Sequence, residues 1–286
     1  MKAIPLLDYL GTPLLFAAFV LLFWLQQTHP LRSQHFSEVN RALRNLVFSA
    51  PAFVLLRLTL IPIPLAVSWW ADARGLGLLH LLPIPALVRS LAGFVALDWA
   101  YYWWHYATHA VPFLWRFHNV HHTDLDLDLS TAARFHFGEI FASIPFRIAA
   151  VLLLGVGPIT LLLFEICFEA ASLFHHSNWR IPLPLERALN RIIVTPRMHG
   201  IHHSIVRRET DSNWGTMFSF WDRLHRTLRI DVAQDEIKIG VAGYRDDREL
   251  TVTRLWKMPF GSQREWRLPD GTVPEREPRP TEELQG

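Results

Sequence analysis

Histidine is the residue type whose spacing stands out in this chain of 286 residues. Eight of its 15 histidines fall into three compact sets: HYATH (105–109), HNVHH (118–122) and HGIHH (199–203). Residues three and four apart lie on one face of a helix, so each set would direct its imidazole rings to one side. Neutral imidazole is the commonest biological metal ligand. The spacing therefore predicts a metal site whose ligands are His105, His109, His118, His121, His122, His199, His202 and His203.

The number of imidazoles indicates two ions rather than one. Two ions with four or five ligands each would use all the histidines of the three sets. Imidazole suits zinc, copper, iron and nickel, so the ligand type alone does not choose the metal. The only cysteine, Cys167, lies in an apolar segment, which excludes a thiolate cluster and an intrachain disulfide. Neither the HExxH motif of zinc proteases nor the paired Glu-x-x-His motifs of soluble di-iron bundles occurs.

The elements that must position these histidines are apolar runs of membrane-spanning length. Half of the residues are hydrophobic and only 19% are charged. A spanning helix needs about 20 mostly apolar residues, and residues 6–26, 45–70 and 87–104 are candidates. Residues 140–174 are long enough for a helical pair, broken at the Gly-Val-Gly-Pro of residues 155–158. The sequence thus predicts an all-α integral membrane helical bundle that crosses the bilayer several times.

Charge and aromatic residues indicate which side of the membrane carries the histidines. Arg32, Arg41 and Arg44 follow the first apolar run, whereas Lys2 stands alone before it. The positive-inside tendency places this arginine loop in the cytoplasm, and counting crossings from there puts all three histidine sets on the cytoplasmic face. Trp and Tyr favour the headgroup level, so WAYYWW (99–104) puts the first set at the bilayer edge. We expect a helical cap on the cytoplasmic face that carries a histidine-rich dimetal site.

Composition divides the chain into three regions. Residues 1–85 are predicted to be membrane anchor helices, and residues 86–230 hold nearly all the unusual chemistry. Residues 231–286 form a charged C-terminal extension, whose end is rich in Pro and Glu and is predicted to be disordered. The net charge of +2 is spread along the chain, so nothing indicates a nucleic-acid partner.

The blocks around the histidines resemble the fatty acid hydroxylase / sterol desaturase superfamily of integral membrane di-iron oxygenases. That family's signature is His-x3-His, His-x2-His-His and a later His-x2-His-His. The similarity covers roughly residues 90–230, so residues 86–230 would be the catalytic domain. Its blocks are LDWAYYWWHYATHAVPFLWRFHNVHHTD (97–124), TAARFHFGE (131–139), FHHSNWRIPLP (174–184), TPRMHGIHHS (195–204) and DSNWGTMFSFWDRLHRT (211–227). Departures are Tyr106, where the family often has Arg, Phe137, where it has Pro, and residues 224–227. They leave the subfamily, and with it the substrate, open.

The resemblance implies an enzyme, an O2-dependent hydroxylase or desaturase of a membrane lipid with two iron ions. The lipid would be a fatty acyl chain, a sterol or a related isoprenoid. A dinucleotide fingerprint and a cytochrome-like domain are both missing from the sequence, so a separate reductase, ferredoxin or cytochrome would supply electrons. Arg187, Arg191, Arg197, Arg207 and Arg208 could dock such an acidic donor or contact anionic headgroups.

The resemblance also adds candidates around the metal site. His176 and His136 are possible further ligands, and His175 is more plausibly a neighbour of the site. Carboxylates and amides orient metal-bound imidazoles by accepting the other ring N–H. Candidates for this role, which could instead be helix caps or solvated groups, are Glu139, Asp211, Asn213, Asp222 and Asp98. Asp98 interrupts an apolar helix, and Glu165 and Glu169 share a face with His176 and could line the same pocket.

The rival function from another class is a membrane metal transporter or metal-binding protein. Transporters usually place their polar ligands near the bilayer midplane. The predicted sites here lie at one membrane edge, which favours the oxidoreductase.

Overall fold

The computed structural model describes residues 7–276, and helices dominate this part of the chain. No strand occurs among these residues, which contain only the isolated bridges Pro30–Trp179, Ile193–Phe218 and Ser204–Ile239. The predicted all-α fold is confirmed for the described residues.

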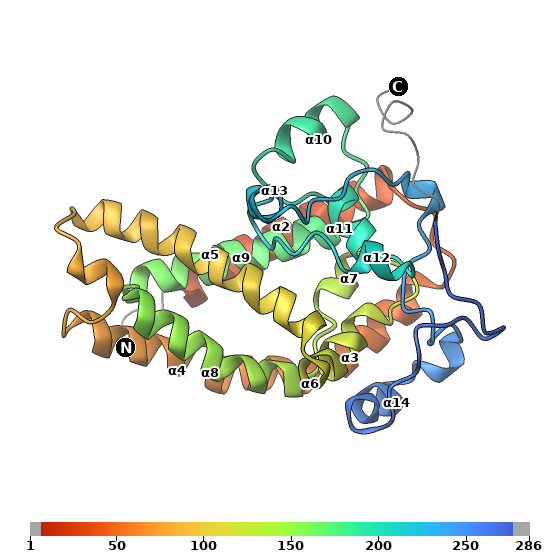
Figure 1. Cartoon of the computed structure of the whole chain (residues 1–286), viewed down its shortest axis with the longest axis horizontal. Helices are drawn as coiled ribbons and strands as arrows, with labels where there is room; N and C mark the ends of the chain where they lie inside the picture. The colour runs from red at the N-terminus through yellow and green to blue at the C-terminus, as the bar shows by residue number, and fades with distance from the viewer. Residues whose placement is uncertain (1–6, 277–286) are drawn as a thin grey trace.

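Long helices run roughly along the longest axis of the molecule (Figure 1). They are α2 (Thr12–Thr28, preceded by the π-helix Leu7–Gly11), α3 (Glu38–Leu55), which continues through the π-helical turn η2 (Leu56–Leu60) into α4 (Pro62–Asp72), α5 (Ala86–Ala110), α8 (Phe137–Leu154) and α9 (Pro158–His176). Helix α4 packs against α8 and α9, and α2 packs against α9 (Figure 1). The anchor helices therefore form one bundle with the helices that follow them.

The break predicted at residues 155–158 is the turn between α8 and α9. Gly155 adopts a left-handed conformation with φ of 75° and ends α8, while Pro158 begins α9. A Cβ atom on Gly77 would lie 2.3 Å from the Cα atom of Gly155, so the loop after α4 packs directly on this turn. Both connections consequently lie at the same end of the bundle, on the left of Figure 1.

Four helices of the described chain are long and apolar enough to cross a membrane: Tyr9–Thr28, Glu38–Asp72, Phe137–Leu154 and Pro158–His176. The predicted span at residues 87–104 forms part of α5, which is not among them. Arg89 and the buried Asp98 interrupt its apolar character. Helix α5 nevertheless runs beside the other long helices (Figure 1).

Short helices gather toward the end of the bundle opposite the Gly77–Gly155 contact, with α10 and α13 above its middle in Figure 1. They are α6 (Pro112–His122), α7 (Leu129–Ala132), α10 (Leu183–Leu189), α11 (Pro196–His202), α12 (Arg207–Thr210) and α13 (Phe220–His225). The end of α2 meets the segment after α9 there, because Leu31 N–H donates to the Asn178 carbonyl over 2.8 Å. All three histidine sets therefore lie at one end of the bundle.

The C-terminal segment contains the 3-10 turns Gln234–Glu236, Asp247–Glu249 and Met258–Phe260 and the helix α14 (Val252–Lys257). Leu250 and Leu255 are fully buried in a cluster with Phe48 of α3 and Val120 of α6. The described part of the predicted extension is thus packed against the bundle. The end of the chain that is predicted to be disordered comprises residues 268–286. Among its described residues, Leu268 N–H donates to the Thr272 carbonyl and Arg276 pairs with Glu209 over 2.8 Å. Residues 277–286 lie outside the described part.

Candidate metal centre

Nine buried histidines form two groups whose ring nitrogens face one another. In each group, one potential ligand atom per residue lies within 4.8 Å of the others. The five-histidine group contains His105 and His109 of α5, His118 and His122 of α6, and His202 of α11. The four-histidine group contains His121 of α6, His176 of α9, His199 of α11 and His203, which follows α11.

Helical spacing explains why the triplet H-x-x-H-H occurs twice. In the first triplet, His118 and His122 are four apart and enter the five-histidine group, while His121 turns toward the other group. In the second, His199 and His203 enter the four-histidine group, while His202 turns toward the first. Each triplet therefore contributes to both groups, and this sharing holds the two groups side by side.

The Nε2 atoms of the four-histidine group converge. Those of His121 and His199 lie 3.1 and 3.0 Å from that of His176, and His203 Nε2 lies 3.0 Å from His199 Nε2. His176 Nδ1 donates to the Ser172 carbonyl over 2.8 Å, so in the neutral ring Nε2 carries no proton and presents a lone pair. A neutral imidazole has only one N–H, so hydrogen bonds cannot satisfy this chain of contacts. Converging lone pairs are what a metal cation requires.

The five-histidine group contains buried ring nitrogens that have no protein partner. They include Nε2 of His118 and His202 and both ring nitrogens of His109 and His122. Buried polar atoms are rarely left without a partner, so these orphans fit a metal ion. Burial also lowers the pKa values of His121, His122, His199, His202 and His203 well below the ordinary value, which keeps their rings neutral and able to bind metal.

A carboxylate and backbone carbonyls orient the rings. His118 Nδ1 donates to Glu139 Oε1 over 2.8 Å, whereas Asp211 Oδ1 lies 3.8 Å from His109 Nδ1, too far for a hydrogen bond. His105 and His202 donate from Nδ1 to the carbonyls of Trp214 and Ser212, over 2.9 and 2.8 Å. Sequence reasoning proposed the two acids but missed the carbonyls, because every residue has one and nothing in the sequence marks those that are used.

The other predicted orienting residues, Asp222, Asp98 and Asn213, hold the backbone around residues 213–221 and make no hydrogen bond to a histidine ring of the two groups. Asp222 accepts hydrogen bonds from the N–H groups of Trp214 and Gly215, each over 2.8 Å, and burial raises its pKa to about 6. Asp98 accepts from Thr216, Met217, Phe218 and Trp221. Asn213 has a positive φ of 57° and donates to the carbonyls of Met198 and Arg229. These three residues hold the segment whose Trp214 carbonyl binds His105.

His136 is not brought to either histidine group, which corrects its prediction as a possible ligand. It caps α8: its Nδ1 accepts from the Gly138 N–H over 2.9 Å. Its Nε2 donates to the Trp256 carbonyl over 3.1 Å, so both ring nitrogens are used. His175 also lies outside the groups, with its ring 4.1 Å from that of His199 between centroids.

A cavity of about 470 Å³ leads to both histidine groups. Its inner wall comes from α5, α8 and α9, and it ends at His105 and His118 of one group and His121, His176 and His199 of the other. Its outer part lies between α2 and α3, where the lining residues Phe19, Leu46 and Phe53 are exposed. The wall is mostly apolar, and the cavity connects an exposed apolar surface of the bundle with the histidines.

Residues 90–227 match the family model of the fatty acid hydroxylases. By this match, residues 90–227 resemble the fatty acid hydroxylases, and they are called the hydroxylase domain below. The match contains all nine histidines of the two groups and the carbonyls that orient them.

Curated relatives of the hydroxylase domain share just under a third of its residues. An ornithine lipid hydroxylase of Rhizobium tropici is 31% identical over 163 residues, 56% of this chain and 47% of the relative. Human alkylglycerol monooxygenase is 30% identical over 142 residues, 49% and 30% of the two chains. Human cholesterol 25-hydroxylase is 29% identical over 171 residues, 58% and 61%. The chain thus spans less than two thirds of these relatives. No solved structure matches it significantly.

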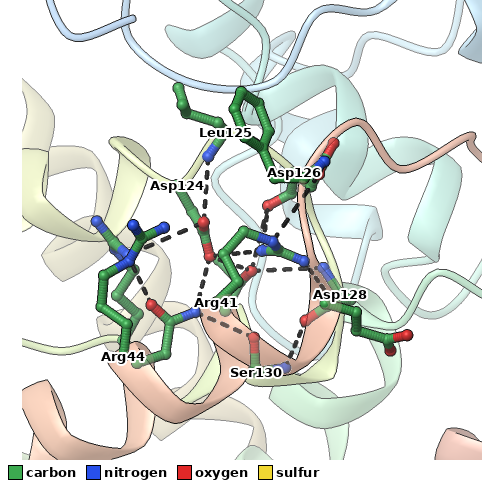
Figure 2. A network of polar contacts seen from close by, with 12 residues as sticks. Arg41, Arg44, Asp124, Leu125, Asp126, Asp128 and Ser130 are labelled. Carbon is green, nitrogen blue, oxygen red and sulfur yellow. Dashed lines mark hydrogen bonds and ion pairs between the residues drawn. The ribbon is translucent and has the colours of Figure 1, made fainter. Parts of the chain in front are cut away.

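A buried ion-pair network ties the hydroxylase domain to α3, which lies outside the matched residues (Figure 2). Arg41 of α3 pairs with Asp124 over 2.9 Å and also with Asp128, just after the first histidine triplet. Asn45 donates to Asp124 over 2.9 Å and accepts from Arg134 over 2.6 Å. Burial opposes ionisation of Asp124, but the guanidinium groups of Arg41 and Arg134 hold its pKa at about 2. The network fixes the end of α6, where His121 and His122 lie.

Proposed function

We propose that the chain is an O2-dependent di-iron hydroxylase that acts on a membrane lipid. The observation that carries this proposal is the pairing of two adjacent histidine groups with an apolar cavity that begins on the lipid-facing surface. A lipid chain has no acidic hydrogen that a side chain could remove. Two iron ions held by the two groups would supply the oxidising chemistry with O2 that side chains lack.

Residues of this chain would bind the metal ions and orient the imidazole rings that hold them. Buried neutral imidazoles are ready to bind metal without first losing a proton. Glu139 accepts the Nδ1 proton of His118 and so directs its Nε2 atom toward the other ligands, as the Trp214 and Ser212 carbonyls do for His105 and His202. The apolar wall of the cavity would exclude water and hold one carbon of the lipid near the histidines.

Hydroxylation is favoured over desaturation by the relatives. Each of the three relatives described above is named for a hydroxylation or monooxygenation reaction. Their names cover an ornithine lipid, an alkylglycerol and a sterol, so they support a lipid substrate without choosing one.

The membrane placement that we propose puts the histidine end of the bundle at the cytoplasmic face, with electrons delivered by a separate donor. Arg197 is paired with Glu186 over 2.6 Å and Arg207 with Asp211 over 2.7 Å, so neither is free for docking. Arg187, Arg191 and Arg208 are exposed. An acidic donor or anionic headgroups would meet these three arginines of the predicted docking segments.

Metal and lipid analysis test the proposal. Purified protein should carry about two iron ions, and membranes from cells that make the protein should contain a lipid that has gained one oxygen atom. His118→Ala and His202→Ala should each abolish that gain, whereas His29→Ala, which replaces an exposed histidine outside both groups, should not. Metal transport into vesicles without O2 consumption would instead favour a transporter.

A further inference from the structure

Charged side chains lie inside the bundle, away from the histidines. Arg147 of α8 pairs with Glu165 of α9, and its guanidinium carbon lies 4.9 Å from the centre of the Tyr101 ring. The Tyr101 hydroxyl donates to Glu165 over 2.8 Å. Glu169 lies one helical turn after Glu165 on the same face of α9. These four residues are called the inner polar set below.

Glu169 is the member of this set whose hydrogen-bonding capacity is unused. It lines the cavity together with Arg147 and Tyr101, and no hydrogen bond to its carboxyl group is found within residues 7–276. Its electrostatic neighbours are Glu165, which is already paired, and Arg147. An ionisable group inside a membrane segment is costly and usually functional. The free carboxyl group therefore faces whatever occupies the cavity.

The inner polar set lies at a defined distance from the histidines. Glu169 precedes His176 of the four-histidine group by seven residues on one helix, roughly 10 Å along the axis at 1.5 Å per residue. Both residues line the same cavity, and Ser172 lies between them on its wall. A lipid in this cavity can therefore touch the inner polar set and the histidine groups simultaneously.

We propose that the inner polar set binds a hydroxyl group of the lipid substrate and thereby selects which carbon reaches the histidines. Arg147 offers N–H donors and Glu169 offers an acceptor, and a hydroxyl group is donor and acceptor at once. A charged headgroup would have to lose its water to enter this depth of the bundle, whereas a neutral hydroxyl loses far less. That the bound lipid is a substrate rests on the proposed function, whereas the binding of its hydroxyl group does not.

Binding of two probes tests the inference without turnover. Purified protein in phosphatidylcholine nanodiscs, whatever its metal content, is titrated with radiolabelled octadecanol and with octadecane, which lacks the hydroxyl. We expect octadecanol to bind at least about tenfold more tightly, the difference that one buried hydrogen bond to a charged group can make. Equal affinities for the two probes would overturn the inference.

Variants of Glu169 identify the group responsible. Glu169→Leu should remove the preference for octadecanol, and Glu169→Gln, which forms the weaker neutral hydrogen bond, should keep part of it. Cys167→Ser, on the exposed face of the same helix, should change nothing. An unchanged preference in Glu169→Leu would overturn the inference. So would a Gln variant as weak as the Leu variant, since a hydrogen-bonding group at position 169 would then not account for the preference.

The two proposals fail separately. If octadecanol is preferred but the protein binds no iron and oxidises no lipid, the binding site stands and the proposed function falls. If iron and lipid oxidation are present but the alcohol and the alkane bind equally, the proposed function stands and the inner polar set has no role in recognition.

Discussion

Each histidine triplet contributes to both histidine groups, because side chains three and four residues along a helix differ by about 100° in direction. His118 and His122 go to one group and His121 to the other. The sequence predicted eight ligands from spacing and a ninth, His176, from resemblance, and the structure brings all nine together. Their division into five and four could not be predicted, because it depends on how α6 and α11 are rotated against each other.

Glu139 and Asp211 allow a prediction at this scale, because both were proposed to orient histidines but lie at different distances. Glu139 is 2.8 Å from His118 Nδ1, whereas Asp211 is 3.8 Å from His109 Nδ1, is partly exposed and is paired with Arg207. We expect Glu139→Ala to weaken metal binding by about 10- to 100-fold, as is typical when a group that orients a ligand is lost. Asp211→Ala should weaken metal binding much less.

The measurement for this pair is iron retained during dialysis against a graded chelator. Glu139→Gln serves as an intermediate variant, because its amide oxygen can still accept the His118 proton. Equal loss of iron from the Glu139→Ala and Asp211→Ala proteins would contradict the orienting role assigned from the distances.

At the scale of elements, the sequence predicted what depends on neighbouring residues and missed what depends on distant ones. The turn at residues 155–158 was predicted because Gly and Pro act locally. The role of Arg41 was missed, since it was interpreted only as a marker of topology, and its partners Asp124 and Asp128 lie more than 80 residues away. His136 was misplaced for the same reason: its partner Trp256 belongs to the C-terminal segment.

Arg41 therefore carries a prediction about how α3 supports α6. Arg41→Met would leave Asp124 buried without its main ion-pair partner, which should lower the free energy of unfolding by about 3–5 kcal/mol. Arg44→Met is the matched control. Arg44 is 14% exposed, but its partner Asp247 is 40% exposed and stays in contact with water when the pair is lost. Arg44→Met should therefore destabilise the protein less than Arg41→Met does. Thermal unfolding in detergent measures both, and equal effects would show that the buried network does not hold α6.

At the scale of the molecule, the hydroxylase domain is completed by segments on both sides of it. The matched residues 90–227 supply the nine histidines of the two groups, but α2 and α3 form the outer part of the cavity. Leu250 and Leu255 from the C-terminal segment complete the core against Phe48 and Val120. Composition divided the sequence into an anchor, a catalytic domain and an extension. Composition indicates whether a segment prefers lipid or water, but it does not indicate which segments pack together.

The buried histidines make the stability of the metal-free protein depend on pH. Burial lowers the pKa values of His121, His122, His199, His202 and His203 in the folded protein, while the unfolded chain should have the ordinary value of about 6.5. Below about pH 6.5 the unfolded state binds more protons than the folded state. The free energy of unfolding is therefore greatest above this pH and decreases as the pH is lowered. When the pH is lowered from about 7.5 to about 6, each of these histidines should reduce the free energy of unfolding by about 0.8 kcal/mol.

Melting temperatures of metal-free and iron-loaded protein across this interval test the linkage. Restricting the interval to values above about pH 6 limits the opposing effect of Asp222, whose folded pKa is about 6 and whose contribution changes mainly below that value. We expect the metal-free protein to melt at progressively lower temperature as pH falls. The iron-loaded protein should show an additional loss, because protons compete with the metal for the same nitrogens once the site opens. A flat profile for the metal-free protein would mean that the histidines are already protonated or solvated in the folded state, and the two groups would then not be preformed metal sites.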